Sequence, residues 1–233
     1  MAMDASDLRQ LLASLQFSDS AFPSGFYTMS HGLEGYSQAG LVERGDVRDL
    51  LEDLLVHAVG PGDATALAVA HRAARATDWD GVQEADQRLF ASKLTAEMRR
   101  ASVRSGHQLI DMAGEVVGGD GIAEYAGRVT ARTTPGCQPV ATAVVYASTG
   151  LTTRSAVASD LFAYAVSFVG AALRLRLTDH RHAQVVLYDI APVIERVAID
   201  ALDRDLEDLG GCAPVADIMS ARHERADARL FAS

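Results

Sequence analysis

Apolar residues recur at helical spacing along most of this chain, and no long stretch alternates between apolar and polar residues as a half-buried strand does. Asp46 is a candidate helix N-cap, and the apolar positions that follow it are Val47, Leu50, Leu51, Leu54 and Leu55. Alanine is abundant, and β-branched residues are scattered among the alanines. The pattern predicts an all-α fold, a single helical bundle of roughly eight to ten helices of typical length.

Glycine and proline mark the expected boundaries between these helices. We expect breaks at GPGD (60–63), GGDG (118–121) and TTPGCQP (133–139), and Gly106 is a candidate interruption of a long helical segment. Pro192 lies inside a helical pattern, where it either kinks the helix or begins a new one. Neither a fixed-period repeat nor a long linker divides the sequence, so its 233 residues are expected to form one domain, 1–233.

The composition argues against several classes of protein. A net charge of −10 disfavours phosphate-backbone binding, which needs clustered Lys and Arg. Cys137 and Cys212 are far apart and in no CxxC pair, which is typical of a reducing compartment. The N-terminal MAMDASDLRQ lacks the apolar core of a secretory signal, and the longest uncharged apolar run, 161–173, is shorter than the ~20 residues of a membrane span. We therefore expect a cytoplasmic protein that binds neither nucleic acid nor membrane, with 161–173 in a buried helix.

The common catalytic and cofactor motifs are missing from the sequence. A P-loop needs a lysine followed by serine or threonine, and the only lysine is Lys93, followed by leucine. GPGDAT lacks the third glycine of a dinucleotide-binding loop, and no G-x-S-x-G nucleophile elbow occurs. We expect no cofactor and no catalytic residue, so any nucleotide would be bound by another protein.

The histidines leave open one alternative of a different class. HERAD (223–227) resembles half of the zinc motif H-E-x-x-H, with Asp227 in place of the second histidine. DHRH (179–182) offers two histidines whose side chains would point apart on a helix. The alternative is therefore a helical metal-binding or hydrolytic protein that uses His31, His180, His182 and His223.

Three blocks stand out from this alanine-rich background. They are LLASLQFSDSAFPSGFYTMSHGLE (11–34), LFASKLTAEMRRASVRSGHQLI (89–110) and APVADIMSARHERADARLFAS (213–233). In their order and in the total length of the chain, they resemble the UreF family of urease accessory proteins. The first and third blocks are the specific ones, whereas the second alone would be a weak indication.

The resemblance implies a function that composition could not indicate. Members of the UreF family are all-α proteins and are not themselves enzymes. They join a GTPase, UreG, and a scaffold protein, UreD (also called UreH), in a complex on the urease apoprotein. That complex delivers nickel to the urease active site. Members commonly form homodimers and are thought to gate GTP hydrolysis by UreG.

The resemblance also assigns two sets of partner-binding residues. Those expected to face UreG are Tyr27, Ser30, Glu34, Asp63 and Arg174. Those expected to face UreD or UreH lie in a C-terminal docking tail over 213–233 and are Arg222, His223, Glu224, Arg229, Leu230 and Phe231. We expect Tyr27, Ser30 and Glu34 to be exposed, and the tail to fold on binding a partner that buries Leu230 and Phe231.

This chain departs from the family pattern at several positions. Phe26 stands where the family has a glycine, Cys137 where a histidine is often found, and Arg174 where many members have lysine. LTDH (177–180) replaces a P-L-G-Q turn. Phe26 therefore indicates either a different turn or a ring that takes part in the contact, and Arg174 keeps the charge of lysine with a different hydrogen-bond geometry.

Overall fold

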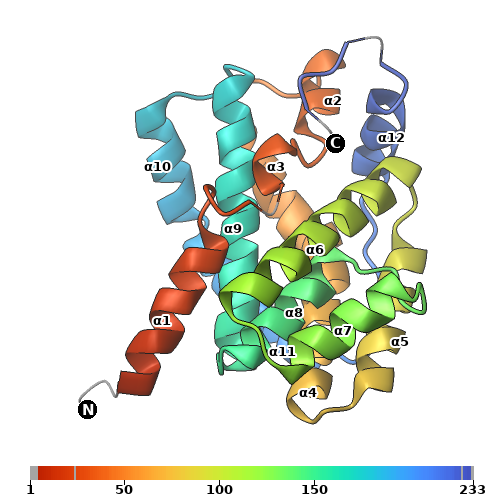
Figure 1. Ribbon diagram of the computed structural model, residues 1–233. Helices are drawn as coiled ribbons and strands as arrows, with labels where there is room; N and C mark the ends of the chain where they lie inside the picture. Colours follow the sequence, from red (N-terminus) through yellow and green to blue (C-terminus); the bar gives the residue numbers. More distant parts are fainter. Residues whose placement is uncertain (1–4, 24, 227, 232–233) are drawn as a thin grey trace.

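The computed structural model describes residues 5–23, 25–226 and 228–231, and all regular structure among them is helical (Figure 1). Its α-helices are α1 (Ala5–Ser18), α2 (Leu33–Gln38), α3 (Val47–Leu54), α4 (Thr65–Arg75), α5 (Trp79–Ser92), α6 (Ala96–Val116), α7 (Asp120–Thr130), α8 (Gln138–Ser148), α9 (Thr153–Arg174), α10 (His180–Asp189), α11 (Ala191–Asp203) and α12 (Pro214–His223). A 3-10 turn, η1 (Phe26–Thr28), and a π-helix, η2 (Leu55–Ala64), complete the helical elements of this part. The all-α prediction is confirmed, although short helices such as α2 bring the number of helices above the expected eight to ten.

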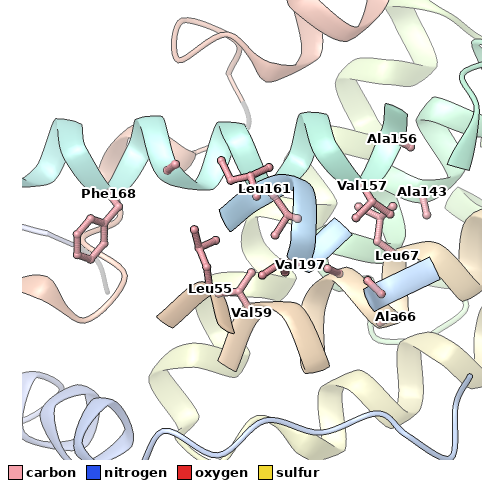
Figure 2. Packing of buried hydrophobic residues seen from close by; sticks show 14 of the residues in the cluster. Leu55, Val59, Ala66, Leu67, Ala143, Ala156, Val157, Leu161, Phe168 and Val197 are labelled. Carbon is pink, nitrogen blue, oxygen red and sulfur yellow. The ribbon is translucent and has the colours of Figure 1, made fainter. Parts of the chain in front are cut away.

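The core is built around α8. Every residue of α8 from Gln138 to Tyr146 is buried, and this helix packs against α4, α6, α7 and α9. A helix that is buried on all sides belongs in the centre of a bundle, which explains why 138–148 contains no charged residue. Figure 2 shows the adjoining layer, in which Leu161 of α9 faces Leu55 of η2, with Val197 of α11 beside them.

The long apolar run at 161–173 lies in α9, as expected for a buried helix. α9 has buried residues along its length, among them Leu161 and Phe168, and packs against α8 and α11. It is also the one helix in the described ranges that is long and apolar enough to cross a membrane. Since 56% of its most apolar window is buried inside the fold, the length and composition of α9 are weak evidence for a membrane span.

The expected break at 60–63 does not occur, because the chain stays helical there and only the winding of the helix changes. α3, η2 and α4 follow one another without a gap from Val47 to Arg75. Proline cannot donate a backbone hydrogen bond, and the stretch around Pro61 is wound as a π-helix. The Pro61 carbonyl accepts from Gly210 N at 3.0 Å, and the His57 carbonyl accepts from Cys212 N at 2.8 Å. The prediction of a break was wrong, and the irregular helix instead fixes the chain segment that leads into α12.

Gly106 does not interrupt α6, which runs unbroken from Ala96 to Val116. The glycine serves a close approach between two chain segments. A Cβ atom at position 106 would lie 2.1 Å from the Gly136 carbonyl oxygen, on the loop before α8. The absence of a side chain at Gly106 therefore sets how closely this loop lies against α6.

Buried Asp86 of α5 organises the predicted break at 133–139. Its Oδ2 accepts from Tyr125 Oη at 3.0 Å, from Thr134 Oγ1 at 2.6 Å and from Gly136 N at 2.7 Å. Its Oδ1 accepts from Cys137 N at 2.8 Å. Four donors around one fully buried carboxylate compensate for its lost hydration and fix the start of α8.

The helix starts follow the sequence signals, with one difference. Pro192 lies in the first turn of α11, so it begins a new helix rather than kinking an old one. Asp179, within the divergent LTDH segment, caps α10 by accepting from two amides, including His182 N at 3.0 Å. Asp46 lies at the N-cap position of α3, but its carboxylate accepts from Glu43 N at 2.8 Å and from no amide of the helix.

Candidate partner-binding site

The two specific sequence blocks meet at one end of the molecule. η1 and α2 come from the N-terminal block, and α12 and residues 228–231 come from the C-terminal block. α12 packs against both α2 and the start of α6, and η1 packs against α9. Figure 1 shows α2 and α12 together at the top of the bundle. Residues that were assigned to two different partners are therefore neighbours in the fold.

Glu34 holds the C-terminal tail against the body. Its Oε1 accepts from Leu230 N at 2.8 Å, and its Oε2 accepts from Phe231 N at 3.0 Å. Gln38, one turn later on α2, donates to the Ala228 carbonyl at 3.2 Å. Only 4% of Glu34 is exposed, so the expectation of an exposed side chain was wrong. Its carboxylate is directed inward because it binds the backbone amides of residues that lie about 196 positions later in the chain.

His223 lies between two buried carboxylates. Its Nε2 is 2.8 Å from Glu34 Oε2, and its Nδ1 is 2.9 Å from Glu97 Oε1. Glu97, in the first turn of α6, also accepts from Ser220 Oγ at 3.3 Å, and that hydroxyl lies 3.0 Å from Thr95 Oγ1. Glu97 was not among the residues predicted from the sequence, although it lies in the second block, which alone would be a weak indication of the family.

Arg174 joins the N-terminal block to the tail. Its guanidinium carbon lies 4.2 Å from the centre of the Tyr27 ring and 4.3 Å from that of the Phe231 ring. It also donates to the Tyr27 carbonyl and, through Nε, to the Gly170 carbonyl at 3.1 Å. Burial lowers the pKa of Arg174, which nevertheless stays charged because a guanidinium titrates far above neutral pH. Tyr27 is 62% exposed, as expected for a contact residue.

The turn around Phe26 is closed by hydrogen bonds beneath it. Gly25 adopts a φ of 84°, and the Phe26 ring packs towards His31, with ring centres 5.7 Å apart. Ser167 of α9 donates to the Phe26 carbonyl at 2.9 Å and lies 2.9 Å from His31 Nε2. Desolvation by burial, with the nearby charges of Lys93 and Arg174, lowers the pKa of His31 to about 3. His31 is therefore a neutral structural residue.

Ser30 is also buried, with no measurable exposure, so its expected exposure was wrong. Its carbonyl accepts from Leu33 N at 3.0 Å, where the chain turns into α2. The residue thus belongs to the turn that sets the position of Glu34. A contact between Ser30 and a partner would require this turn to open.

Asp63 lies in η2 and forms an ion pair with the only lysine. Lys93 Nζ donates to Asp63 Oδ1 at 2.7 Å, and the lysine side chain is 9% exposed. Both residues line a cavity of about 170 Å³ that reaches His31 and Asp160. Burial raises the pKa of Asp160 to about 7, and Gln138 Nε2 donates to Asp160 Oδ1 at 2.7 Å. Asp63 and the turn residue His31 therefore line the same cavity.

The remaining tail residues differ widely in exposure. Arg222 and Leu230 are exposed, and Leu230 is 65% accessible. Glu224 forms an ion pair with Arg100 of α6, and Arg229 lies 3.7 Å from Glu97. Phe231 is only 5% exposed in the chain alone, so the expectation that a partner is needed to bury it was wrong. Positions 227, 232 and 233 of the predicted tail lie outside the described residues.

The four histidines of the metal-site alternative have separate surroundings. His31 contacts Ser167, His182 contacts Thr178 at 3.0 Å, and His223 lies between two glutamates. His180 is exposed at the start of α10. Across the part of the chain that the structure describes, no group of three or more His, Cys, Asp or Glu side chains could hold a metal ion. The geometry thus gives no support to a metal centre built from these histidines.

Comparison with known proteins identifies the family. The sequence profile of UreF matches residues 41–191, which is more than half of the chain. The chain belongs to the UreF family. The family named from the three sequence blocks is therefore confirmed, although the first and third blocks lie outside the profile match.

Full-length relatives in the UreF family cover those two blocks as well. The urease accessory protein UreF 2 of Brucella canis is 33% identical over 227 residues, spanning 95% of this chain and 91% of the relative. UreF of Trichodesmium erythraeum is 32% identical over 98% of this chain and 99% of its own length. UreF of Yersinia pestis is 33% identical over 99% of this chain and 100% of its own length. All three are named as accessory proteins of urease.

Proposed function

We propose that this chain is a urease maturation adaptor without catalytic activity of its own. It joins the UreG GTPase and UreD (UreH) in a complex on the urease apoprotein, where nickel is the cargo, and it gates GTP hydrolysis by UreG. The relatives support the first part of this proposal, because they carry the name of urease accessory proteins. We place the protein in the cytoplasm, away from membranes and nucleic acid.

The observation that carries the proposal is the stack of Arg174 between Tyr27 and Phe231. One ring comes from the block assigned to UreG, and the other comes from the block assigned to UreD. A partner that moves the tail would remove one face of this stack and leave Tyr27 held by Arg174 alone. The arrangement therefore supports an adaptor in which the two partners influence each other through a shared side chain.

The burial pattern divides the assigned residues into two roles. Tyr27, Arg222 and Leu230 are exposed and can contact a partner directly. Glu34 and His223 are buried and act by positioning the tail. The proposal therefore assigns binding to the first group and the shape of the surface to the second.

A homodimer is part of the same proposal. α1 exposes four leucines, each 46% or more accessible, and Figure 1 shows this helix extending from the bundle. The residues are Leu8, Leu11, Leu12 and Leu15. A helix face of this kind favours contact with another protein, and a second copy of the chain is the occupant that we propose.

The test is co-expression with UreG and UreD, followed by size-exclusion chromatography. The wild-type chain should elute with both proteins, and R174A should retain its fold but lose UreG from the shared peak. The matched control is R154A, an exposed arginine at the other end of α9. Failure of the wild-type chain to form any shared complex would remove the basis for the proposal, and equal behaviour of the two variants would exclude the role of Arg174.

A further inference from the structure

His31 and Ser167 form a chain of two hydrogen bonds beneath the turn that carries Tyr27. Ser167 of α9 donates its hydroxyl proton to the Phe26 carbonyl at 2.9 Å. A hydroxyl has one proton and a carbonyl can only accept, so the Ser167 oxygen can only accept from a second partner. His31 Nε2 lies 2.9 Å from that oxygen and must therefore be the donor. The chain thus runs in one direction, from His31 through Ser167 to the backbone of η1.

The ring of His31 has a single proton with which to make this bond. Burial and the charges of Lys93 and Arg174 lower the pKa of His31 to about 3, so the ring is neutral near pH 7. The bond to Ser167 requires the proton on Nε2 and not on Nδ1. The contact therefore selects one tautomer of the histidine.

The backbone at His31 has a conformation that few residues adopt. Its φ is 54°, in the left-handed region that is uncommon for residues other than glycine. The ring lies between two others, with centres 4.3 Å from that of Tyr164 and 5.7 Å from that of Phe26. Unfavourable backbone conformations persist where surrounding contacts hold them, and they concentrate at functional sites.

η1 is attached to α9 through two successive carbonyls. The Phe26 carbonyl accepts from Ser167, and the Tyr27 carbonyl accepts from Arg174, seven positions later on the same helix. Residues seven apart lie on one face of a helix, two turns from each other. The Phe26 carbonyl also accepts from Met29 N at 3.0 Å, which closes the 3-10 turn. The bond from Ser167 therefore fixes this turn relative to Arg174.

Ser167 has a competing acceptor within its own helix. A serine inside a helix often donates to the carbonyl four positions earlier, which here is that of Ala163. The donor at His31 favours the rotamer that places the Ser167 oxygen between the imidazole and the Phe26 carbonyl. Without that donor, this rotamer keeps only one of its two bonds, and the hydroxyl is free to turn back to α9.

We propose that His31 is a positioning residue for the contact with UreG, acting through Ser167 on the turn that carries Tyr27. Its Nε2–H group holds the Ser167 hydroxyl on the backbone of η1, and the turn then presents the Tyr27 ring beside Arg174. This inference rests on the proposed function, in which Tyr27 and Arg174 face UreG. It adds two residues, His31 and Ser167, that shape this surface from below.

The test is the affinity of UreG for the co-purified complex of this chain with UreD. S167A removes the hydroxyl that holds η1, and H31F keeps an aromatic ring but has no N–H group. Both should weaken UreG binding by about tenfold, the upper range for the loss of one neutral hydrogen bond. S159A, a change at a partly buried serine of the same helix, should stay within about twofold of the wild type.

Glutamine at position 31 separates positioning from a general loss of stability. The side-chain amide of H31Q can donate to Ser167, so H31Q should bind UreG more tightly than H31F does. Equal binding by these two variants overturns the inference, and if H31F does not fold, equal binding by S167A and S159A does so. A wild-type complex that binds no UreG refutes the proposed function, and this inference falls with it.

The ring ¹⁵N signals of the histidine-labelled chain test the hydrogen-bond chain without any partner. At pH 7, His31 should be neutral, with its proton on Nε2. A neutral ring with its proton on Nδ1 would overturn the proposal, because Nε2 could then not donate to Ser167.

Discussion

Replacing Glu34 by glutamine would remove one of the two carboxylate oxygens on which the C-terminal tail depends. In the native chain, Oε1 accepts from Leu230 N at 2.8 Å, and Oε2 accepts from Phe231 N at 3.0 Å and faces His223. Glutamine has the same shape but offers only one oxygen. In either orientation of the side-chain amide, its NH₂ group meets a backbone N–H that also donates. E34Q therefore tests the hydrogen bonds without leaving a cavity.

The magnitude follows from the bonds that are lost. A hydrogen bond to a charged group contributes about 1.5–3 kcal/mol, and a buried donor left without an acceptor costs about 1–3 kcal/mol. One tail amide loses its acceptor and His223 loses a carboxylate partner, so the free energy of unfolding should fall by about 3 kcal/mol. The loss cannot exceed the free energy with which α12 and the tail bind the body, because a released tail no longer senses the substitution.

Urea denaturation measures the change, with hydrogen exchange at Leu230 and Phe231 as the local readout. E195Q on the exposed face of α11 is the matched control, and it should stay within about 0.5 kcal/mol of the wild type. If E34Q falls within the same limit and its tail amides remain protected, then Glu34 does not hold the tail and the reasoning above is refuted.

Three other changes test the fold around the site. D86N removes an acceptor from a carboxylate with four donors, and we expect a loss of about 3–5 kcal/mol in urea denaturation, whereas equal stability would exclude the role of Asp86. G106A places a Cβ atom 2.1 Å from the Gly136 carbonyl and should lower stability by about 3 kcal/mol or more, and an unchanged melting temperature would contradict that close approach. The pKa of Asp160, raised by burial to about 7, means that the folded chain holds a proton that the unfolded chain releases near pH 4, so stability falls as pH rises between these values. D160N should remove this slope, leave the free energy of unfolding at pH 4 unchanged and raise it by up to about 4 kcal/mol at pH 8. Identical stability–pH profiles for D160N and the wild type would contradict the raised pKa of Asp160.

The fold class could be predicted because periodicity and composition agree. The all-α architecture and the buried helix at 161–173 follow directly from apolar spacing. The continuity of the chain through Pro61 could not be predicted, because it depends on carbonyls that are satisfied by Gly210 and Cys212, about 150 positions away. The prediction of a break at Gly106 was wrong for the same reason. The glycine is required by the close approach of Gly136, about 30 positions away, and not by a local break in the helix.

The assignment of residues to a partner-binding site stays a prediction, and the burial of several of them could not be predicted from the sequence. The block resemblance selected Glu34 and His223, yet a family motif does not say which side chains point inward. Acidic and imidazole groups are usually exposed, and their burial here is made possible by partners far apart in the sequence. Glu97 was missed because its role is visible only once α6 and α12 are packed together.

The arginine at position 174 has a consequence that a lysine would not share. A planar guanidinium can stack on rings at two faces and still donate in its plane, whereas an ammonium is a compact point charge. Arg174 uses both properties, with Tyr27 and Phe231 as rings and the Tyr27 and Gly170 carbonyls as acceptors. Phe26, the other departure in this region, turns its ring inwards towards His31 and leaves Tyr27 as the exposed aromatic group of the turn. The two departures therefore fit together, because one sets the direction of the turn and the other fixes its exposed ring to the tail.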